Sequence, residues 1–205
     1  MMLQGMTVEY LIRRTYPVKS GQTVLLHAAA GGVGLIACQW LKHLGAIVIG
    51  TAGGPEKMAL AKAHGATHVI DSRKEDVAKR VREITGGKGV PVVYDGVGKD
   101  TFQASLDSLS PRGMFVSFGN ASGAVPPFEP VLLSSKGSLY FTRPSLMAYT
   151  TTREELLASA QALFDVVAKG VVKIEVHQTY PLKDAAQAQR DLEGRKTTGS
   201  TVLLP

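Results

Sequence analysis

The sequence predicts an α/β protein with a doubly wound parallel sheet, followed by an appendage of different character. Short apolar, β-branched runs alternate with helical stretches of about 10 to 15 residues, which is typical of βαβ units. These runs are continuously apolar, as expected for strands that helices cover on both faces. Right-handed crossovers then place helices on both sides of the sheet. A glycine cluster directly after the first run marks the turn into the first crossover helix.

Elements of the first half follow from apolar spacing and from the glycines and prolines between them. Leu3 to Arg14 carries apolar residues at roughly helical spacing, and Pro17 and Gly21 end that segment. Pro55 suits the first turn of a helix, and Gly45 suits the position just after one. The predicted order is strand 23–27, helix 33–44, strand 46–50 and helix 55–64.

The same alternation continues into the second half and then stops. We predict strand 68–70, helix 75–84, strand 90–94, helix 101–109, and strands 114–118 and 138–142. Pro91 lacks an N–H donor and confines the start of its strand to an edge or end position. The appendage is predicted as helix 153–169, strand 173–180, helix 183–192 and strand 201–204. We therefore expect a dinucleotide-binding unit over residues 1–150 and a separate C-terminal segment over 151–205.

Composition narrows the class of protein. The 205 residues are 44% hydrophobic and 20% charged, as in ordinary globular proteins, and the formal net charge is +6. Such a charge suits an anionic ligand. The longest basic stretch, from Arg73 to Arg82, is interrupted by Glu75 and Asp76, which favours a solvated helix face over a nucleic-acid surface. We expect no nucleic-acid partner.

Location and metal content follow from absences in the sequence. Cys38 is the only cysteine, so the chain forms neither an internal disulfide nor a cysteine zinc cluster. No apolar run approaches the roughly 18 residues of a membrane helix, and the N-terminus lacks the features of a signal peptide. His64 and His68 are four residues apart, but Gly65 lies between them at a helix end. We expect a cytoplasmic protein without a membrane segment or a bound metal.

The strongest motif is the run Ala28-Ala29-Ala30-Gly31-Gly32-Val33-Gly34, which follows a predicted strand and opens a predicted helix. That setting is the one a dinucleotide fingerprint requires. Gly31 would let the backbone approach a pyrophosphate, and Gly34 would let the helix pack closely on the strand. The N–H groups and dipole of the helix would hold the phosphates. Ala29 replaces the first glycine of the usual pattern.

A missing acid predicts which dinucleotide binds. Sites that prefer NAD place Asp or Glu at the end of the second strand, where it binds the ribose hydroxyl. Here the strand ends in residues 50–54, GTAGG, without an acid, and Lys57 and Arg73 follow. A neutral loop with nearby cations suits a 2′-phosphate and favours NADPH. The alternative is that both cations are ordinary solvated charges.

Glycines also follow two later strands, in residues 95–98 (DGVG) and 117–120 (SFGN). Ligands of open α/β sheets lie outside the carboxyl ends of strands, so these loops would border the cofactor. They could equally be plain turns. Several catalytic patterns are absent, among them a Tyr-x-x-x-Lys pair and a Gly-x-Ser-x-Gly elbow. The motifs alone therefore name no catalytic residue.

The run from His27 to Gln39, HAAAGGVGLIACQ, resembles the NADPH-dependent quinone oxidoreductases, the zeta-crystallin-like branch of the medium-chain dehydrogenase/reductase family. Four later segments are similar in the same order: 93–95, 116–120, 137–139 and 142–146. The resemblance covers essentially the whole chain. It implies a Rossmann fold without catalytic zinc, and a hydride passed from NADPH to a quinone or related conjugated carbonyl.

The resemblance also implies roles for individual residues. Thr7 would lie beside the nicotinamide, and Arg195 would approach the cofactor phosphates. The pyrophosphate would lie against Gly31, Gly32, Val33 and Gly34. The adenosine ribose and its 2′-phosphate would meet Thr51, Gly53 and Lys57. The nicotinamide side would be lined by Phe118, Gly119, Asn120, Phe141, Thr142 and Arg143.

The chain departs from the family pattern in two places. Relatives often carry a tyrosine near the adenosine where Ser72 stands, so the mode of 2′-phosphate binding by Ser72 and Arg73 is open. Family members also begin with an N-terminal catalytic domain that we do not find here. We therefore expect a fragment, an engineered piece or a truncated gene product, whose segment 151–205 would complete that second domain.

Two classes of function remain at this point. The first is an oxidoreductase, in which the cofactor carries the chemistry and a quinone-like acceptor takes its proton from water. An enoyl reductase on the same scaffold belongs to this class. The second is a non-catalytic nucleotide- or RNA-binding module. We favour the oxidoreductase, with NADPH as cofactor, no named catalytic residue, and a homodimer formed through the edge strand Ser138–Thr142, whose Leu139, Tyr140 and Phe141 carry no charge.

Overall fold

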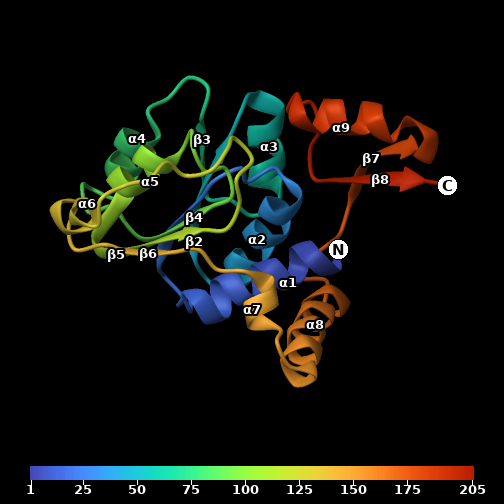
Figure 1. Cartoon of the computed structure of the whole chain (residues 1–205), viewed down its shortest axis with the longest axis horizontal. Helices are drawn as coiled ribbons and strands as arrows, with labels where there is room; N and C mark the ends of the chain where they lie inside the picture. The colour runs from blue at the N-terminus through green and yellow to red at the C-terminus, as the bar shows by residue number, and fades with distance from the viewer.

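A computed structural model describes residues 1–205. Its centre is a six-stranded parallel sheet in the order β3-β2-β1-β4-β5-β6 (Figure 1). The strands are β1 (Thr23–Leu26), β2 (Ile47–Ala52), β3 (His68–Asp71), β4 (Val90–Asp95), β5 (Leu109–Ser117) and β6 (Tyr140–Thr142). The strand order reverses between β1 and β4, which lie side by side in the middle of the sheet. This order confirms the predicted doubly wound fold.

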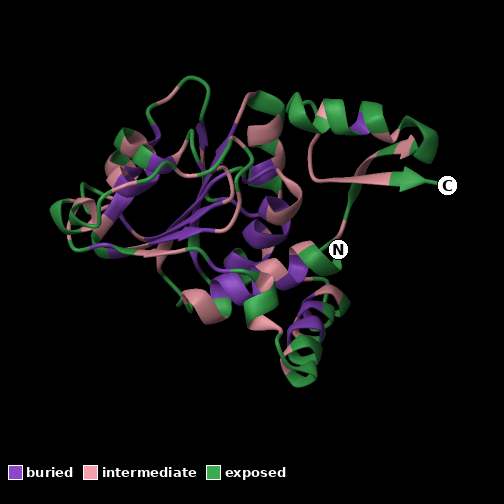
Figure 2. Ribbon diagram, in the orientation of Figure 1, coloured by how far each residue is buried: buried purple, intermediate pink, exposed green.

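Alternation along each strand divides the core into two layers. Val24 and Leu26 point into one buried cluster, which also takes in the helices that begin at Met2 and Gly32. Leu25 points into the other cluster, on the opposite face of the sheet, with Phe102 and Phe115. Figure 2 shows this buried material concentrated along the sheet and its flanking helices. Each strand is therefore covered on both sides, as its continuous apolar sequence predicts.

Helices join the strands in the predicted order. They are α1 (Met2–Tyr10), α2 (Gly32–His43), α3 (Pro55–Ala63), α4 (Val77–Ile84) and α5 (Phe102–Ser108). The first helix ends in a π-helical turn, η1 (Leu11–Thr15), which the apolar spacing did not indicate. The helix expected from residue 75 begins at Val77, because the Asp76 carboxylate accepts the Lys79 N–H at 3.0 Å and caps it.

Pro91 lies in a central strand, near its start, where the register to β5 shifts between Val90 and Val92. The expected end position is thus confirmed, since a register shift accommodates a residue without an N–H. Two short helices, α6 (Val131–Ser135) and α7 (Leu146–Tyr149), were not predicted. Both are at most five residues long, too short for apolar periodicity to reveal.

The remaining elements form the C-terminal segment. They are α8 (Arg153–Ala168), β7 (Val176–Pro181), η2 (Leu182–Asp184), α9 (Ala185–Glu193) and β8 (Ser200–Leu204). Strands β7 and β8 pair in parallel as a sheet of their own, and α9 lies over them beside α3 (Figure 1). None of the helices combines the length and the apolar character that crossing a membrane requires.

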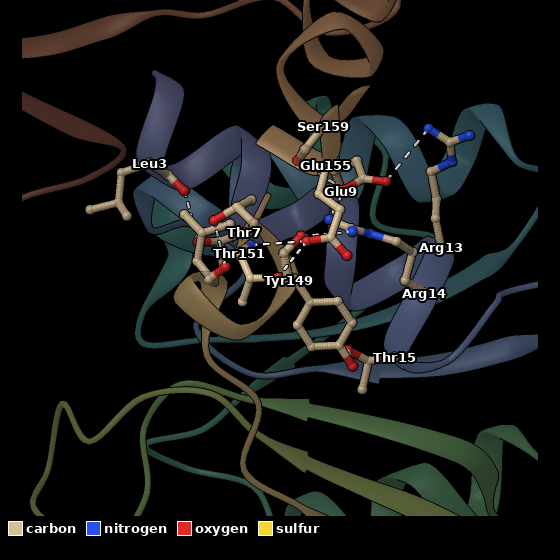
Figure 3. A network of polar contacts seen from close by, with 12 residues as sticks. Leu3, Thr7, Glu9, Arg13, Arg14, Thr15, Tyr149, Thr151, Glu155 and Ser159 are labelled. Carbon is tan, nitrogen blue, oxygen red and sulfur yellow. Dashed lines mark hydrogen bonds and ion pairs between the residues drawn. The ribbon is translucent and has the colours of Figure 1, made fainter. Parts of the chain in front are cut away.

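A buried carboxylate fastens α8 and α7 to the first helix, as Figure 3 shows. Glu9 accepts the Ser159 hydroxyl at 2.9 Å and pairs with Arg14 at 2.8 Å. Arg14 also donates to the Tyr149 carbonyl at 2.8 Å and lies over the Tyr149 ring. The Tyr149 ring stacks on Tyr10, with 4.6 Å between the ring centroids. These contacts fix the position of α7 and α8 against the sheet unit, which is the six-stranded sheet with its flanking helices.

Candidate functional site

The glycine loop lies between β1 and α2, at the point where the strand order reverses. Gly31 is the residue before α2, and no side chain caps the first turn of that helix. A β-carbon on Gly31 would contact only the Ala28 carbonyl, at 3.3 Å, with open space elsewhere. The Gly31 N–H donates to the Ala28 carbonyl at 3.0 Å, but the open space beside Gly31 lets a ligand come close to the backbone at the end of the helix that favours anions.

Gly34 has the packing role that the motif predicts. A β-carbon there would lie 2.7 Å from the carbonyl carbon and oxygen of Ala29, too close for any side chain. The first turn of α2 thus contacts the loop backbone directly. Gly32 lies against the side chain of Gln4 from α1, and Val33 is half-buried beside it. The loop is held from below by the sheet and from one side by the first helix.

Three cations gather near the first turn of α3. Lys57, from the first turn of α3, donates from Nζ to the Arg195 carbonyl at 2.6 Å. Burial, together with the nearby charges of Arg73 and Arg195, lowers the pKa of Lys57. Arg73 lies over Gly53, where a β-carbon would come within 2.7 Å of its Nε. The structure therefore brings together three cations from separate elements. Arg195 also pairs with Asp100 at 3.3 Å, whereas Lys57 and Arg73 have no carboxylate in an ion pair, so their charges favour an anion.

Two polar side chains near these cations, Thr51 and Asp71, already have hydrogen-bond partners within the chain. Thr51 is only 3% exposed, and its hydroxyl bonds to the Ala28 N–H and to His27, each at 3.2 Å. Its hydroxyl is thus committed beneath the loop, away from the expected ribose contact. Asp71, the buried acid at the end of β3, accepts the N–H groups of Gly54 at 3.3 Å and Arg73 at 3.0 Å. Ser72 is exposed beside them.

The loops after β4 and β5 contact each other backbone to backbone. A β-carbon on Gly119 would lie 2.9 Å from the Gly96 Cα, and the Phe118 ring packs against Gly96. Asn120 is exposed at the tip of the second loop. Gly98 has a φ of +93°, a conformation that glycine adopts without strain. The glycines after these two strands therefore permit close approach at the carboxyl edge of the sheet.

The residues expected beside the nicotinamide differ in what they offer. The Phe141 ring packs edge-on against Phe115 and Phe128, both at 5.2 Å between centroids, so it belongs to the core. Thr142 is half-buried at the end of β6. Arg143 is exposed. Burial raises the pKa of Tyr10 to about 12, and the nearby positive charge of Arg143 opposes this rise. The Thr7 hydroxyl donates to the Leu3 carbonyl at 2.7 Å within α1.

The C-terminal segment closes over the glycine loop, which the sequence did not indicate. The Gly199 N–H donates to the Ala30 carbonyl at 2.9 Å, and Gly199 forms a parallel bridge with Gly31. Ser200 donates to the Gln4 side chain at 3.0 Å. These contacts join residues more than 160 positions apart, so local patterns carry no trace of them.

Further functional residues come from buried polar groups. His27, directly before the glycine loop, bonds to Ser105 at 3.0 Å, and Ser105 donates to Asp95 at 2.6 Å. All three side chains are fully or almost fully buried. A polar residue at the end of an apolar run, followed by Ala28 in one case and by Gly96 in the other, is the signal that could have found His27 and Asp95.

The arrangement of potential ligands bears on metal binding. No three His, Cys, Asp or Glu side chains are placed to hold a metal ion. Cys38 is buried in the core, and burial raises the pKa of its thiol to about 12. A thiol so disposed does not fit a zinc ligand, because ligation requires the thiolate.

A parallel sheet in the order 3-2-1-4-5-6, with a glycine loop at its switch point, defines the class of dinucleotide-binding Rossmann domains. The family model described as "Zinc-binding dehydrogenase" matches residues 32–165. The chain belongs to this family. Within it, the resemblance to quinone oxidoreductases is confirmed by similarity at the level of sequence and of structure.

Three relatives illustrate that similarity. A quinone oxidoreductase of Pseudomonas aeruginosa is 55% identical over 100% of this chain and 63% of its own length. A 2-haloacrylate reductase of a Burkholderia species is 50% identical over 100% of this chain and 62% of its own length. The crystal structure of Escherichia coli quinone oxidoreductase complexed with NADPH matches with a TM-score of 0.97 at 56% identity, covering 99% of this chain and 63% of that one. The chain thus spans somewhat less than two thirds of the relatives it matches.

Proposed function

We propose that this chain binds NADPH and forms the cofactor-binding part of a reductase that transfers hydride to a quinone or related conjugated carbonyl. The proposal is carried by two observations together: the cluster of Lys57, Arg73 and Arg195, and a glycine loop before α2 that no side chain caps. Residues 1–150 would form the dinucleotide-binding unit. Residues 151–205 would belong to the part of the protein that holds the acceptor.

The chain offers a suitable group for each anionic part of the cofactor. The N–H groups of Gly32, Val33 and Gly34 would hold the pyrophosphate, and Gly31, whose own N–H donates to the Ala28 carbonyl at 3.0 Å, would let the backbone come close. Arg195, which pairs with Asp100 at 3.3 Å, would approach from the C-terminal segment. Lys57 and Arg73, above Gly53, would hold the 2′-phosphate, with Ser72 exposed at its side. The Asp71 carboxylate near them is engaged by backbone N–H groups, so it leaves the cations free for a phosphate.

On the other side of the switch point, Phe118, Gly119 and Asn120 would border the nicotinamide. Thr7, Thr142 and Arg143 would lie across from them. Phe141 would contribute only its backbone, since its ring is in the core. Bound NADPH supplies the hydride. The protein holds and orients it, and a quinone-like acceptor takes its proton from water, so we assign no catalytic residue. Relatives named quinone oxidoreductase and 2-haloacrylate reductase support a conjugated acceptor.

We also propose a homodimer through β6. This strand is an edge of the sheet, and its Tyr140 is 59% exposed. An unpaired edge offers free N–H and C=O groups that a second copy can pair with across a two-fold axis. Sedimentation should show a dimer that Tyr140→Lys weakens, and a monomer at micromolar concentration would refute it. A cytoplasmic location stays a prediction from the sequence.

Replacing Gly31 tests the proposed site. Gly31 has φ −84° and ψ 173°, which valine adopts readily, so Gly31→Val should fold while its side chain fills the space before α2. We expect NADPH binding, followed by fluorescence titration, to be abolished, and Gly31→Ala to weaken it less. Circular dichroism checks the fold. Normal NADPH binding by folded Gly31→Val would show that the cofactor does not use this loop.

A further inference from the structure

A continuous line of hydrogen bonds runs at the carboxyl edge of the sheet, from the glycine loop to the loop after β4. The Ala28 N–H donates to Thr51 Oγ1 at 3.2 Å, and this oxygen lies 3.2 Å from His27 Nδ1. The other ring nitrogen of His27, Nε2, lies 3.0 Å from Ser105 Oγ. Ser105 Oγ donates to Asp95 Oδ2 at 2.6 Å. The line crosses from β2 through the end of β1 to α5 and β4.

The Asp95 carboxylate fixes the direction of this line. Besides Ser105, it accepts the Thr101 hydroxyl at 2.7 Å and the N–H groups of Val97 and Gly98 at 2.8 and 3.0 Å. An ionised carboxylate only accepts, so the Ser105 proton points to Asp95 and its oxygen must accept from His27. His27 therefore carries its proton on Nε2, and its Nδ1 accepts the Thr51 hydroxyl.

The surroundings of His27 keep it neutral. The ring is completely buried, and desolvation lowers its pKa despite the opposing charge of Asp95. A neutral imidazole has one donor and one acceptor, and both are used here. Protonation would place a second donor against Thr51, whose hydroxyl already has to accept from Ala28. Only one tautomer satisfies every member of the line.

Each end of the line is a loop beside the switch point between β1 and β4. Ala28 has a φ of +53°, a conformation that alanine rarely adopts, and its N–H is held by Thr51 just before Gly31. At the other end, Asp95 holds the turn that carries Gly96 and Gly98, against which the loop after β5 packs. These two loops flank the switch point between β1 and β4, which a dinucleotide must bridge.

We propose that His27 is a positioning residue, which couples the glycine loop to the loop after β4 through Thr51, Ser105 and Asp95 and so presets their spacing for the dinucleotide. The role in binding rests on the proposed function. The coupling itself does not, because the bonds are present in the chain alone. His27 touches neither the cofactor nor an acceptor in this role.

A double-mutant cycle tests the coupling. Thr51→Val and Ser105→Ala each remove one bond to His27, and each should weaken NADPH binding by about fivefold to tenfold. Because they break one line, the double variant should be little worse than either single one. Thr51→Ser keeps the hydroxyl and should restore affinity. Losses that multiply in the double variant would overturn the proposal.

Ser108→Ala is the matched control. Ser108 is as buried as Ser105 and lies on the same helix, but its hydroxyl donates to the Ala104 carbonyl at 2.7 Å, outside the line. This variant should lower stability somewhat and leave NADPH affinity unchanged. If it weakens NADPH binding as much as Ser105→Ala does, the effect comes from general destabilisation and the proposed coupling is wrong.

Two readouts need no cofactor. Nitrogen-15 spectra of the wild-type chain should show His27 neutral, with the proton on Nε2, from about pH 5.5 to 8. Amide exchange at Ala28 should quicken in Ser105→Ala and stay unchanged in Ser108→Ala. The coupling would be overturned if His27 became protonated in this pH range, or if amide exchange at Ala28 were the same in Ser105→Ala as in the wild-type chain. Failure of the wild-type chain to bind NADPH would instead contradict the proposed function, while these readouts still decide the coupling.

Discussion

The sheet unit and the C-terminal strand pair differ sharply in what holds them together. Around the six-stranded sheet, two clusters of buried apolar side chains fill both faces. In the C-terminal pair, neither β7 nor β8 contains a buried residue, and α9 contributes only Ala188 (Figure 2). One region is stabilised by its own core. The other depends on what it contacts.

Its contacts are concentrated at the proposed cofactor site. The Gly199 N–H donates to the Ala30 carbonyl in the glycine loop, and the Arg195 carbonyl accepts a hydrogen bond from Lys57 Nζ. Glu175 lies between His64 and His177, at 3.4 and 3.7 Å from their ring nitrogens. The sheet and its helices therefore supply the fold, and the C-terminal strand pair should respond to whatever binds at the glycine loop.

The largest effect is expected from a change inside the sheet unit. Gly34→Ala places a methyl group 2.7 Å from the Ala29 backbone, which cannot move without disturbing β1. Overpacking of this kind should lower the free energy of unfolding by about 3 kcal/mol, measured by urea denaturation. Gly32→Ala is the control, because its methyl meets only the flexible Gln4 side chain. Equal stability of the two variants would show that close packing at Gly34 is unimportant.

Hydrogen exchange compares the two regions directly. Amides of β7 and β8 should exchange about 100-fold faster than those of β1 and β4, because opening the pair exposes little apolar surface. NADPH should slow exchange in β8 more than in β4, since Gly199 and Arg195 lie at the site. Uniform protection across both regions, or no change in β8 with NADPH, would remove the distinction.

A smaller effect concerns the cation that joins the two regions. Burial, Arg73 and Arg195 lower the pKa of Lys57 below the ordinary lysine value of 10.5. The ammonium binds phosphate, so affinity is present below this pKa and is lost as pH rises through it. NADPH affinity should therefore fall about threefold to tenfold between about pH 7 and 10, earlier than for an ordinary lysine.

Lys57→Arg supplies the control for that titration, because arginine keeps its charge throughout this range. Its NADPH affinity should stay nearly flat over the same pH interval, in titrations followed by fluorescence. If the wild-type chain and Lys57→Arg show the same pH profile, Lys57 does not hold the phosphate.

The difference between the regions also explains how far the sequence could be interpreted. Within the sheet unit, apolar runs and glycines predicted every strand and the role of Gly34, because burial on both faces leaves a continuous local signal. For Phe141, the sequence could not show that the ring packs against Phe115 and Phe128, which are distant in sequence. For Thr51, it could not show that the hydroxyl bonds to the Ala28 N–H under the loop. The roles of both residues at the cofactor stay predictions.

Long-range polar contacts could not be predicted from the sequence. Nothing in the residues around His27 indicates that Ser105 lies beside it, since the pairing depends on where α5 crosses the sheet. The closure of Gly199 over Ala30 likewise depends on the path of the whole C-terminal segment. Hydrogen bonds of this kind follow from the fold and leave no periodicity.

We propose that the cations near the start of α3 select a phosphorylated dinucleotide, and isothermal titration of the chain with NADPH and NADH measures this selection. We predict that NADPH binds at least about tenfold more tightly, which corresponds to about 1.4 kcal/mol from the 2′-phosphate. Lys57→Ala should reduce this ratio while leaving NADH affinity almost unchanged. Equal affinities for the two dinucleotides in the wild-type chain would contradict the account.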